Sequence, residues 1–485
     1  MRIWVLSMVA ALSAAAATAF VGEGSNPPWF PSLMAFEHYD SGRTKLFERA
    51  HFTGSFTRHN AVDVRVSLDE YPTPYNVVYL SGGSLFVFGG AYGDRGGTGS
   101  FVARVDPQTL QTLWFNQLIN TVETHEWNYP GVLSALHNGF LYLIYGYRLA
   151  KLDPQNGRVL GQMELPTGRA APRDTSYNGL SGLRDGTLVA KSVYRERGCE
   201  QQGFSAFLCC PHPQLVPNSV VVAIDPRTLE VIDQTVAPEL IGGRITATEF
   251  ENHSYIYLTG QKTVYRYIYE NRRLRRDFSW NPGTVVLSGQ NGPTAVAVMN
   301  DWVVFGTDSL PAATPLSVVA INQADASRQF SSQPFADVGQ SWSPSAVSVD
   351  PLRNRIFALD GLAGQIAAVD LRDDGLHTVW TKPQNTTEFL ALIGPAERRV
   401  LVGTDAAGQP MPPSCPVGGG TQDSVVWRNA DTGDEIARTS APLPAVNKGT
   451  MVEPGYAGRM YFLAQNGKIM ELTVRPARPG EDQPK

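Results

Sequence analysis

A short phrase recurs three times in this chain, and it constrains the fold more than any other feature. It is an apolar run that ends in Asp-Pro, followed by a turn and a second apolar run, as in VARVDPQTLQTLW at Val102–Trp114. Close copies are RLAKLDPQNGRVL at Arg148–Leu160 and VVAIDPRTLEVI at Val221–Ile232. Pro fixes φ for a turn, and Asp accepts hydrogen bonds from the turn's own backbone. The phrase therefore predicts a β-hairpin, and a row of metal-binding carboxylates is the weaker interpretation.

The hairpin belongs to a larger unit of four short strands, of which the second is the clearest. Eight such second strands are found: Leu85–Phe88, Phe140–Tyr145, Thr187–Lys191, Tyr255–Thr259, Trp302–Gly306, Arg355–Leu359, Arg399–Gly403 and Arg459–Leu463. Their starts lie 44 to 68 residues apart. Periods of about 40–50 residues with four strands are typical of propeller blades. We therefore expect an all-β fold, a β-propeller of eight four-stranded blades, with seven blades as the alternative.

The last unit ends at Lys468–Val474 and lacks a fourth strand. An isolated strand near the N-terminus, Val62–Leu68, alternates apolar and polar residues. We expect this strand to complete the last blade, because closure removes an open sheet edge. The expected organisation is a propeller over residues 60–475, preceded by an extension over 20–59 and followed by a flexible tail over 476–485.

The turn motif resembles that of the quinoprotein-like (PQQ-like, YVTN-type) propeller superfamily, whose repeats place Asp at the turn, Gly four residues on and Trp eight residues on. Asp106 is followed by Trp114, and Asp153 by Gly157, whereas Asp225 has neither partner. The resemblance covers most of residues 60–475 with degenerate motifs, and it implies a propeller. It also implies a quinone-dependent dehydrogenase as one alternative function, although no Ca²⁺-binding set of Glu, Asn and Asp is identifiable.

The N-terminus has the pattern of a secretory signal peptide. Arg2 is followed by an apolar run, Ile3–Ala17, and by the small-x-small sequence Ala17-Thr18-Ala19. The run is shorter than the ~20 apolar residues that span a bilayer. We therefore expect cleavage after Ala19, so that residues 1–19 are removed. The mature protein is expected to be secreted, or periplasmic in a Gram-negative host, with no membrane span and as a monomer.

Two further features bear on partners. The net charge is −5 and there is no long basic tract, which argues against nucleic acid as a partner. Sequons begin at Asn252 and Asn385, so both are glycosylation candidates in a eukaryotic host. The eight His residues show no His-x-His or His-x-x-x-His spacing, and no metal site is predicted.

Propellers bind ligands around the central channel, and the loops that lead into the innermost strands line its mouth. Two of these loops, Glu123–Gly131 and Arg173–Gly179, are rich in ionisable and aromatic residues. His125 and Tyr177 are proton-transfer candidates, and Arg173 or Arg244 is a candidate clamp for a carboxylate. The other ligand-binding candidates are Glu123, Glu126, Asn128, Tyr129, Asn178, Arg244 and Lys448. This set suits proton abstraction beside a carboxylate, as in lyases.

A structural interpretation of the same residues stands beside the catalytic one. Tyr and Asn side chains can satisfy the turns of the channel, and Glu126 or Asp174 can pair with Arg173. The sequence leaves open whether the protein is an enzyme, and it identifies no cofactor. Three functions stand: a small organic or carbohydrate ligand bound at the mouth, with lyase-type chemistry; a non-catalytic propeller for a glycan or protein; and the quinone-dependent dehydrogenase.

The four cysteines suggest that loops are stapled over the mouth. Cys199, Cys209 and Cys210 lie in one predicted loop of the third unit, and Cys415 lies in the matching loop of the seventh. An even count in an exported chain favours disulfides. We expect a local bridge from Cys199 to Cys209 or Cys210, with the remaining cysteine joined to Cys415. The alternatives are a vicinal Cys209–Cys210 bridge, and a local bridge with two free thiols.

Overall fold

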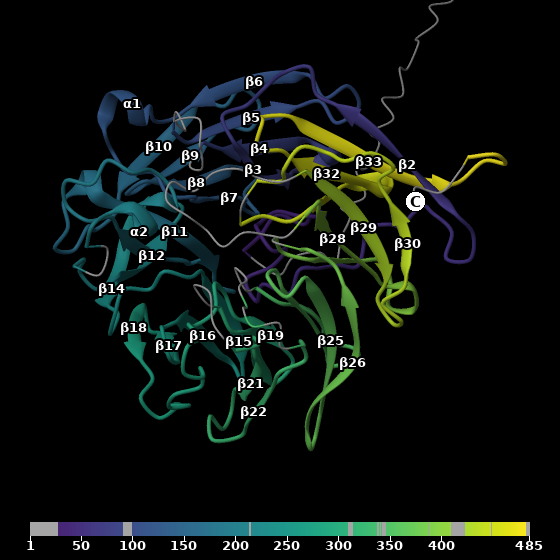
Figure 1. The fold of residues 1–485 in the computed structure, drawn as a ribbon. Coiled ribbons are helices and arrows are strands. Elements are labelled where there is room, and N and C mark those ends of the chain that lie inside the picture. Colours follow the sequence, from purple (N-terminus) through teal and green to yellow (C-terminus); the bar gives the residue numbers. More distant parts are fainter. Residues whose placement is uncertain are drawn as a thin grey trace, which may run out of the picture.

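The computed structural model describes residues 28–90, 99–212, 215–308, 314–336, 339, 341, 346–386, 388–408, 422–447 and 449–481. Within this part of the chain, eight antiparallel sheets stand side by side in a ring (Figure 1). The prediction of an eight-bladed β-propeller is confirmed. The resemblance to quinoprotein-like propellers is consistent with this architecture.

The first four blades each contain strands that follow one another in sequence from the inner to the outer edge. They contain β3 (Pro74–Tyr79), β4 (Leu85–Gly89), β5 (Phe101–Val105) and β6 (Thr112–Gln117); β7 (Val132–Ala135), β8 (Leu141–Tyr145), β9 (Arg148–Leu152) and β10 (Val159–Glu164); β11 (Thr175–Gly182), β12 (Leu188–Tyr194), β13 (Val220–Asp225) and β14 (Glu230–Val236); and β15 (Ile245–Phe250), β16 (His253–Thr259), β17 (Val264–Glu270) and β18 (Arg273–Arg276).

The last four blades follow the same order. They contain β19 (Ala297–Met299), β20 (Trp302–Gly306), β21 (Val318–Asn322) and β22 (Gln329–Ser332); β23 (Ser348–Asp350), β24 (Arg355–Asp360), β25 (Gln365–Arg372) and β26 (Gly375–Pro383); β27 (Ala391–Ile393), β28 (Val400–Ala406), β29 (Asp423–Asn429) and β30 (Glu435–Arg438); and β31 (Glu453–Pro454), β32 (Arg459–Leu463), β33 (Ile469–Pro476) and β2 (Asn60–Val66). Each predicted second strand is found as the second strand of a blade.

The ring is closed by the N-terminal strand, as predicted. β2 pairs antiparallel with β33 over seven residue pairs, from Asn60 with Pro476 to Val66 with Met470. The alternation in this strand does not give a buried apolar face: Val62 is buried, but Val64 and Val66 are 41% and 46% exposed. An outermost strand has a neighbour on one side only, so its side chains are covered less than those of the inner strands.

The recurring Asp-Pro phrase makes turns. The carboxylate of Asp106 accepts hydrogen bonds from the backbone N–H of Gln108 and Thr109, at 2.7 and 2.9 Å. Asp153 and Asp225 each accept the bond from the backbone N–H two residues on, at 2.8 and 2.9 Å. Four residues after each Asp, the backbone is left-handed: φ is 61° at Leu110, 73° at Gly157 and 56° at Leu229. Two leucines therefore occupy a conformation that favours glycine.

The Trp and Gly of the motif meet across a blade boundary. A Cβ atom on Gly157 would lie 2.6 Å from the ring of Trp114, and the Trp114 indole N–H donates to Pro154 O at 3.2 Å. Trp380 of the sixth blade packs in the same way against Gly433 of the seventh. The degenerate motif thus marks the contacts in which one blade docks on the next, which explains its recurrence without any chemistry.

The centre of the ring is occupied by residues 28–50, here called the channel segment (Figure 1, purple). Its backbone pairs with the innermost strands of several blades in turn. These contacts join Phe30 N to Ala135 O, Tyr79 N to Met34 O, Ala135 N to Ala35 O, Ala247 N to Ser41 O, Val298 N to Gly42 O, Val349 N to Thr44 O and Leu392 N to Lys45 O. Within the segment, β1 (Leu46–Phe47) adds a parallel strand to β27. The segment is therefore part of the folded ring.

Candidate functional site

Two short helices carry the predicted mouth loops. The first, α1 (Thr121–Thr124), is capped at its N-terminus by the Asn120 side chain and ends at His125, whose φ is 56°. The second, α2 (Ser205–Cys209), lies in the long loop between β12 and β13. In Figure 1 both lie toward the outer side of the ring, away from the channel segment.

The long loop contains a local disulfide bridge, as predicted. Cys199 and Cys210 form a disulfide with Cα atoms 5.8 Å apart, so the vicinal alternative is wrong. Cys209 is also disulfide-bonded. Cys415 lies outside the described residues, and its bridge across the mouth stays a prediction.

The three residues predicted to be catalytic are not brought together. Tyr177 is buried, and its hydroxyl donates to Pro166 O at 2.7 Å. Burial raises its pKa well above the ordinary value. His125 and Arg173 are 65% and 49% exposed, and both lie beside Glu200: His125 Nδ1 is 3.6 Å from Oε2, and an Arg173 terminal nitrogen is 3.9 Å from Oε1. The surface cluster His125, Arg173 and Glu200 is called the rim cluster below.

The remaining mouth residues are mostly engaged with other protein groups. Glu126 accepts two hydrogen bonds from the guanidinium of Arg148, at 2.5 and 2.9 Å. The Asn128 amide donates to Ser100 Oγ at 3.0 Å. Tyr129 packs against Trp127 and Phe207. Glu123 is exposed, and Lys448 lies outside the described residues.

The predicted pairing of Arg173 with a carboxylate is only partly realised. Asp174 lies 3.0 Å from Arg195 and 3.8 Å from Arg173. The nearest partner of Asp174 is thus an arginine that the sequence analysis did not select. Arg195 also donates to His125 O at 3.0 Å, which ties α1 to the start of the disulfide loop.

A buried network joins the blades to the channel segment. Arg244 lies 3.0 Å from Glu37 Oε1 and donates to Tyr75 Oη and to the carbonyl of Asn178. The Lys191 ammonium donates to the Asn178 side chain and, at 2.5 Å, to Ile241 O. Burial lowers the pKa of Lys191 well below its ordinary value, and Arg244 and Arg43 lower it further. Asn178 and Arg244, both predicted to bind ligand, therefore hold blades and channel segment together.

The glycosylation candidates differ in their surroundings. Asn252 is exposed in the turn between β15 and β16. The Asn385 amide donates to Ala406 O at 3.3 Å and to Gly408 O at 3.0 Å, so a glycan there would remove one of the two donor hydrogens that make these bonds. Modification at either site stays a prediction. Among the described residues, no cluster of three or more His, Cys, Asp or Glu could hold a metal ion, and no helix is long and apolar enough to cross a membrane.

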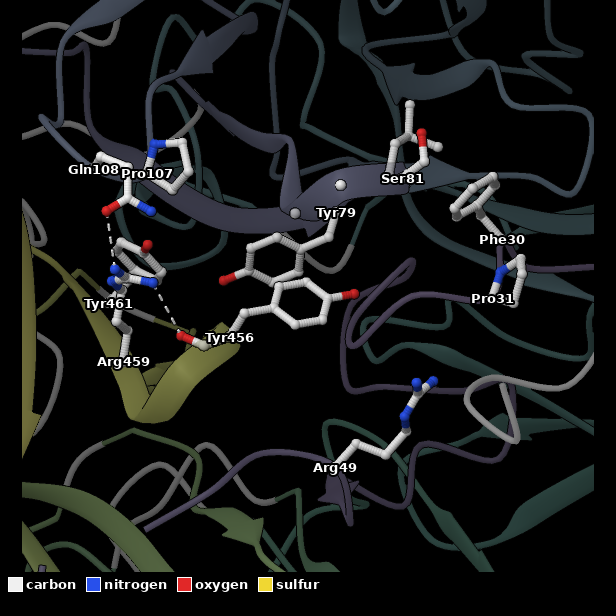
Figure 2. A pocket seen from close by; sticks show the side chains of 13 residues that line it. Phe30, Pro31, Arg49, Tyr79, Ser81, Pro107, Gln108, Tyr456, Arg459 and Tyr461 are labelled. Atoms are coloured by element: carbon white, nitrogen blue, oxygen red, sulfur yellow. Dashed lines mark hydrogen bonds between the residues drawn. The ribbon is translucent and has the colours of Figure 1, made fainter. Parts of the chain in front are cut away.

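The structure contains a pocket that the sequence analysis did not predict (Figure 2). It has a volume of about 710 Å³ and lies between the first and last blades, beside the channel segment. Its apolar walls are Phe30, Pro31, Tyr79, Tyr456 and Tyr461. We call it the tyrosine pocket. The rings of Tyr79 and Tyr456 meet edge to face at its centre, 5.2 Å apart.

The tyrosines of the pocket are fixed by hydrogen bonds. The Tyr79 hydroxyl donates to Pro454 O at 3.0 Å, and the Tyr456 hydroxyl accepts from the backbone N–H of Leu33 at 2.8 Å. Burial raises the pKa of Tyr79, Tyr456 and Tyr461. These phenols therefore stay neutral near pH 7 and provide rigid ring surfaces.

Two arginines border the pocket, and they differ in their partners. Arg459 donates to Gln108 Oε1 at 3.2 Å, and its Nε lies 3.3 Å from Glu471. Arg49 enters from the other side in Figure 2 and is partly exposed. Among the described residues, Arg49 makes no hydrogen bond or ion pair, and its charge acts on the nearby Tyr456 phenol, whose pKa it lowers against the effect of burial.

A second pocket, of about 420 Å³, lies under the middle of the channel segment. Asp40, Ser41, Arg184 and Glu249 line it. Asp40 accepts hydrogen bonds from the backbone and hydroxyl of Thr44, at 3.1 and 2.9 Å, and Glu249 accepts from Ser254 at 2.6 Å. It is smaller and lacks aromatic walls, so the tyrosine pocket is the stronger candidate site.

The sequence contains no local signal for the tyrosine pocket, because its walls come from distant parts of the chain. Phe30 and Arg49 belong to the channel segment, Tyr79 to the first blade, and Tyr456 to the last. Closure of the ring brings them together. The sequence indicated only that the first and last blades of a closed propeller are neighbours, and not that a pocket forms between them.

Comparison with known proteins supports the fold and no closer relation. No protein-family model matches the sequence, and neither does any curated protein. Among solved structures, quinohemoprotein alcohol dehydrogenase from Comamonas testosteroni is similar, with a TM-score of 0.56 and 12% identity over 94% of this chain and 82% of that one. The enzyme from Pseudomonas putida HK5 has a TM-score of 0.54 at 12% identity, over 92% and 81%.

BamB from Moraxella catarrhalis is also similar, with a TM-score of 0.52 and 11% identity over 85% of this chain and all of that one. The predicted resemblance to the quinoprotein-like propellers is therefore confirmed at the level of fold. The similar structures include dehydrogenases and BamB, which are different proteins with the same fold. At 11–12% identity, the shared fold does not indicate which function this chain has.

Proposed function

We propose that this protein is an exported β-propeller that binds a small organic or carbohydrate ligand without transforming it, and that the tyrosine pocket is the binding site. The observation that carries the proposal is the pocket itself: about 710 Å³ of concave space with aromatic walls. Ligand pockets are commonly 300–1,000 Å³, apolar in their walls, with few polar groups. Ring surfaces of this kind stack on planar molecules and on the C–H faces of sugars.

Binding without catalysis follows from the chemistry of the walls. General acid–base catalysis needs a group whose pKa lies near the working pH. The pocket tyrosines have raised pKa values, and the Tyr79 and Tyr456 hydroxyls already make hydrogen bonds with the backbone. The charged side chains at the pocket are the guanidinium groups of Arg49 and Arg459, a group that serves to bind anions.

Export is supported by two observations. The leader pattern over residues 1–19 has the composition of a signal peptide. The Cys199–Cys210 disulfide fits a protein that folds in an oxidising compartment. Identification of the N-terminal residue of the protein recovered from culture medium or periplasm tests this: we expect Phe20, and recovery of the intact leader would contradict it.

The binding site is tested with a ligand screen on the mature protein and two variants. Phe30→Ala removes a pocket wall, and we expect it to weaken binding of each hit about tenfold, because an aromatic wall contributes ~1 kcal/mol or more. Phe115→Ala is the control, since Phe115 is an exposed ring on β6 that does not line the pocket. Hits that bind Phe30→Ala normally would place the site elsewhere.

A second candidate function is lyase-type chemistry at the rim cluster. It is favoured by one observation, the 3.6 Å approach of His125 to Glu200 beside the Arg173 guanidinium, since such a His can exchange protons. If this function is correct, His125→Ala and Arg173→Ala abolish turnover. Tyr177→Phe should retain it, because the Tyr177 hydroxyl is buried against Pro166.

The quinone-dependent alternative finds no residue set among those described. No cluster of three or more metal-ligating side chains is present there, and Arg244 and Lys191 already donate to protein acceptors. An absorbance spectrum of the purified protein tests it: a quinone band that copurifies with the protein would favour this function over simple binding.

A further inference from the structure

Arg49 differs from the neighbouring arginines because no carboxylate pairs with it among the described residues. Arg43 bonds to Glu37 at 2.8 Å, and Arg399 lies 2.6 Å from Glu48. Glu48 is the immediate neighbour of Arg49 in sequence, yet its carboxylate is paired with Arg399. Arg49 lines the tyrosine pocket with no such partner among the described residues. The pocket thus holds one uncompensated positive charge.

The position of this charge matters as much as its presence. In Figure 2 the Arg49 guanidinium lies on one side of the pocket, and Arg459 with Gln108 lies on the opposite side, with the Tyr79 and Tyr456 rings between them. Arg459 lies 3.3 Å from Glu471, a carboxylate that also pairs with Arg65. One end of the pocket is therefore formed by an arginine without a carboxylate partner, its middle is aromatic, and the arginine at its far end is held by a carboxylate.

A partly buried guanidinium without a counterion favours an anion, because removal from water weakens its hydration and strengthens its attraction to negative charge. Arginine presents a planar fork of N–H donors that matches a carboxylate in a bidentate arrangement. The partly exposed rings of Tyr456 and Phe30 offer flat surfaces on which an unsaturated or aromatic body can stack.

We propose that the tyrosine pocket binds small monoanions that have a planar apolar body and one carboxylate, with the carboxylate on Arg49 and the body against Tyr456 and Phe30. This inference rests on the proposed function and specifies its ligand class. A neutral sugar would leave the guanidinium without a partner, and a dianion would place its second charge near the apolar walls.

The test compares two probes that share one ring system, 2-naphthoate and the neutral 2-naphthalenemethanol, by isothermal titration calorimetry. We expect the wild-type protein to bind the carboxylate at least tenfold more tightly than the alcohol, because a hydrogen bond to a charged group contributes about 1.5–3 kcal/mol. Arg49→Gln should remove this preference and leave the affinity for the alcohol unchanged. Arg272→Gln, an exposed arginine in the β17–β18 turn, is the control for net charge and should behave as wild type.

The outcomes separate the two proposals. Equal affinity for both probes, or a preference that survives Arg49→Gln, overturns the assignment of the carboxylate to Arg49 while binding in the pocket stands. Failure of both probes to bind, or binding that Phe30→Ala leaves unchanged, overturns the pocket itself and with it the proposed function. Loss of the preference in both Arg49→Gln and Arg272→Gln would indicate general charge attraction and also overturns the inference.

Discussion

The channel segment builds two regions of opposite character. In the interior of the ring, Arg43 bonds to Glu37, to Ile245 O and to Leu180 O. At the tyrosine pocket, six positions later, Arg49 has no partner among the described residues. The interior charges bind the segment to the blades, whereas we propose that the charge at the pocket holds a ligand. On this proposal, an arginine without a carboxylate partner marks the binding site, whereas crowded ionisable groups mark ion pairing.

The rim cluster supports the same distinction. The loops that contain it were selected from the sequence because they are rich in acidic residues, histidine and arginine. In the structure Glu126 pairs with Arg148 and Asp174 with Arg195, which leaves only the loosely spaced His125, Arg173 and Glu200 at the surface. Exposed pairs of this kind contribute little to stability, about 0–1 kcal/mol.

The largest expected effect comes from removing the interior region altogether. A chain that starts at Asp69 lacks the channel segment and β2, and we expect it to show no cooperative unfolding transition in urea. A chain that starts at His51 keeps β2 and should retain a transition at a clearly lower midpoint. Tryptophan fluorescence and far-UV circular dichroism report both. An unchanged midpoint for the Asp69 chain would show that neither element holds the ring closed.

The next effect concerns the buried ion pair. Arg43→Met leaves Glu37 buried with Arg244 as its remaining charged partner and removes donors from two carbonyls. Breaking a buried pair costs about 3–5 kcal/mol, and we expect a loss of that size in the free energy of unfolding. Arg173→Met, at the exposed rim cluster, should cost less than about 1 kcal/mol. Similar losses for the two variants would remove the distinction between interior and rim.

The pH dependence of stability gives a third, smaller effect from the interior. Burial, with Arg43 nearby, lowers the pKa of Lys45 to about 7. Between pH 7 and 10 the unfolded chain holds this proton and the folded protein does not, so the free energy of unfolding rises with pH over that window. The slope is at most ~1.4 kcal/mol per pH unit. Below pH 7 both states are protonated, and the full cost of the buried charge remains.

Urea unfolding of the wild type and Lys45→Met at pH 7, 8 and 9 measures that slope. The variant removes the titrating group and keeps much of its volume, so its stability should change less with pH than that of the wild type. If both proteins gave the same profile, the Lys45 ammonium would not be held in the dry interior that the structure describes.

The sequence predicted the parts of the fold that depend on residues close together in the chain. The strand period, the Asp-Pro turns and the alternation of Val62–Leu68 each depend on residues close together in the chain, and the blades, turns and closing strand follow from them. The channel segment has no repeat and pairs with strands as distant as β27, so nothing in its own sequence reveals its position.

The same limit explains the candidate sites. The side chains of Ser176 and Tyr177 point to opposite faces of β11, as successive residues of a strand do, and the sequence does not say which face meets the channel. Tyr177 turned into the packed interior beside Pro166. The tyrosine pocket needs Phe30, Arg49 and Tyr456 together, and only ring closure provides that.

The smallest effect on stability is expected for Arg49→Gln, and it tests most directly whether the arginine at the pocket differs from the arginines that pair within the fold. Arg49→Gln removes a guanidinium that has no partner among the described residues, so we expect the free energy of unfolding to change by less than about 0.5 kcal/mol, as at surface positions without specific contacts. Arg148→Gln is the matched case, because it removes two hydrogen bonds to Glu126 and a contact with the Tyr147 ring 4.1 Å away. It should cost about 1 kcal/mol or more. Denaturant titrations at low salt measure both. A loss on Arg49→Gln as large as that on Arg148→Gln would mean that Arg49 is used by the fold, and the charge would then not be available to hold a carboxylate.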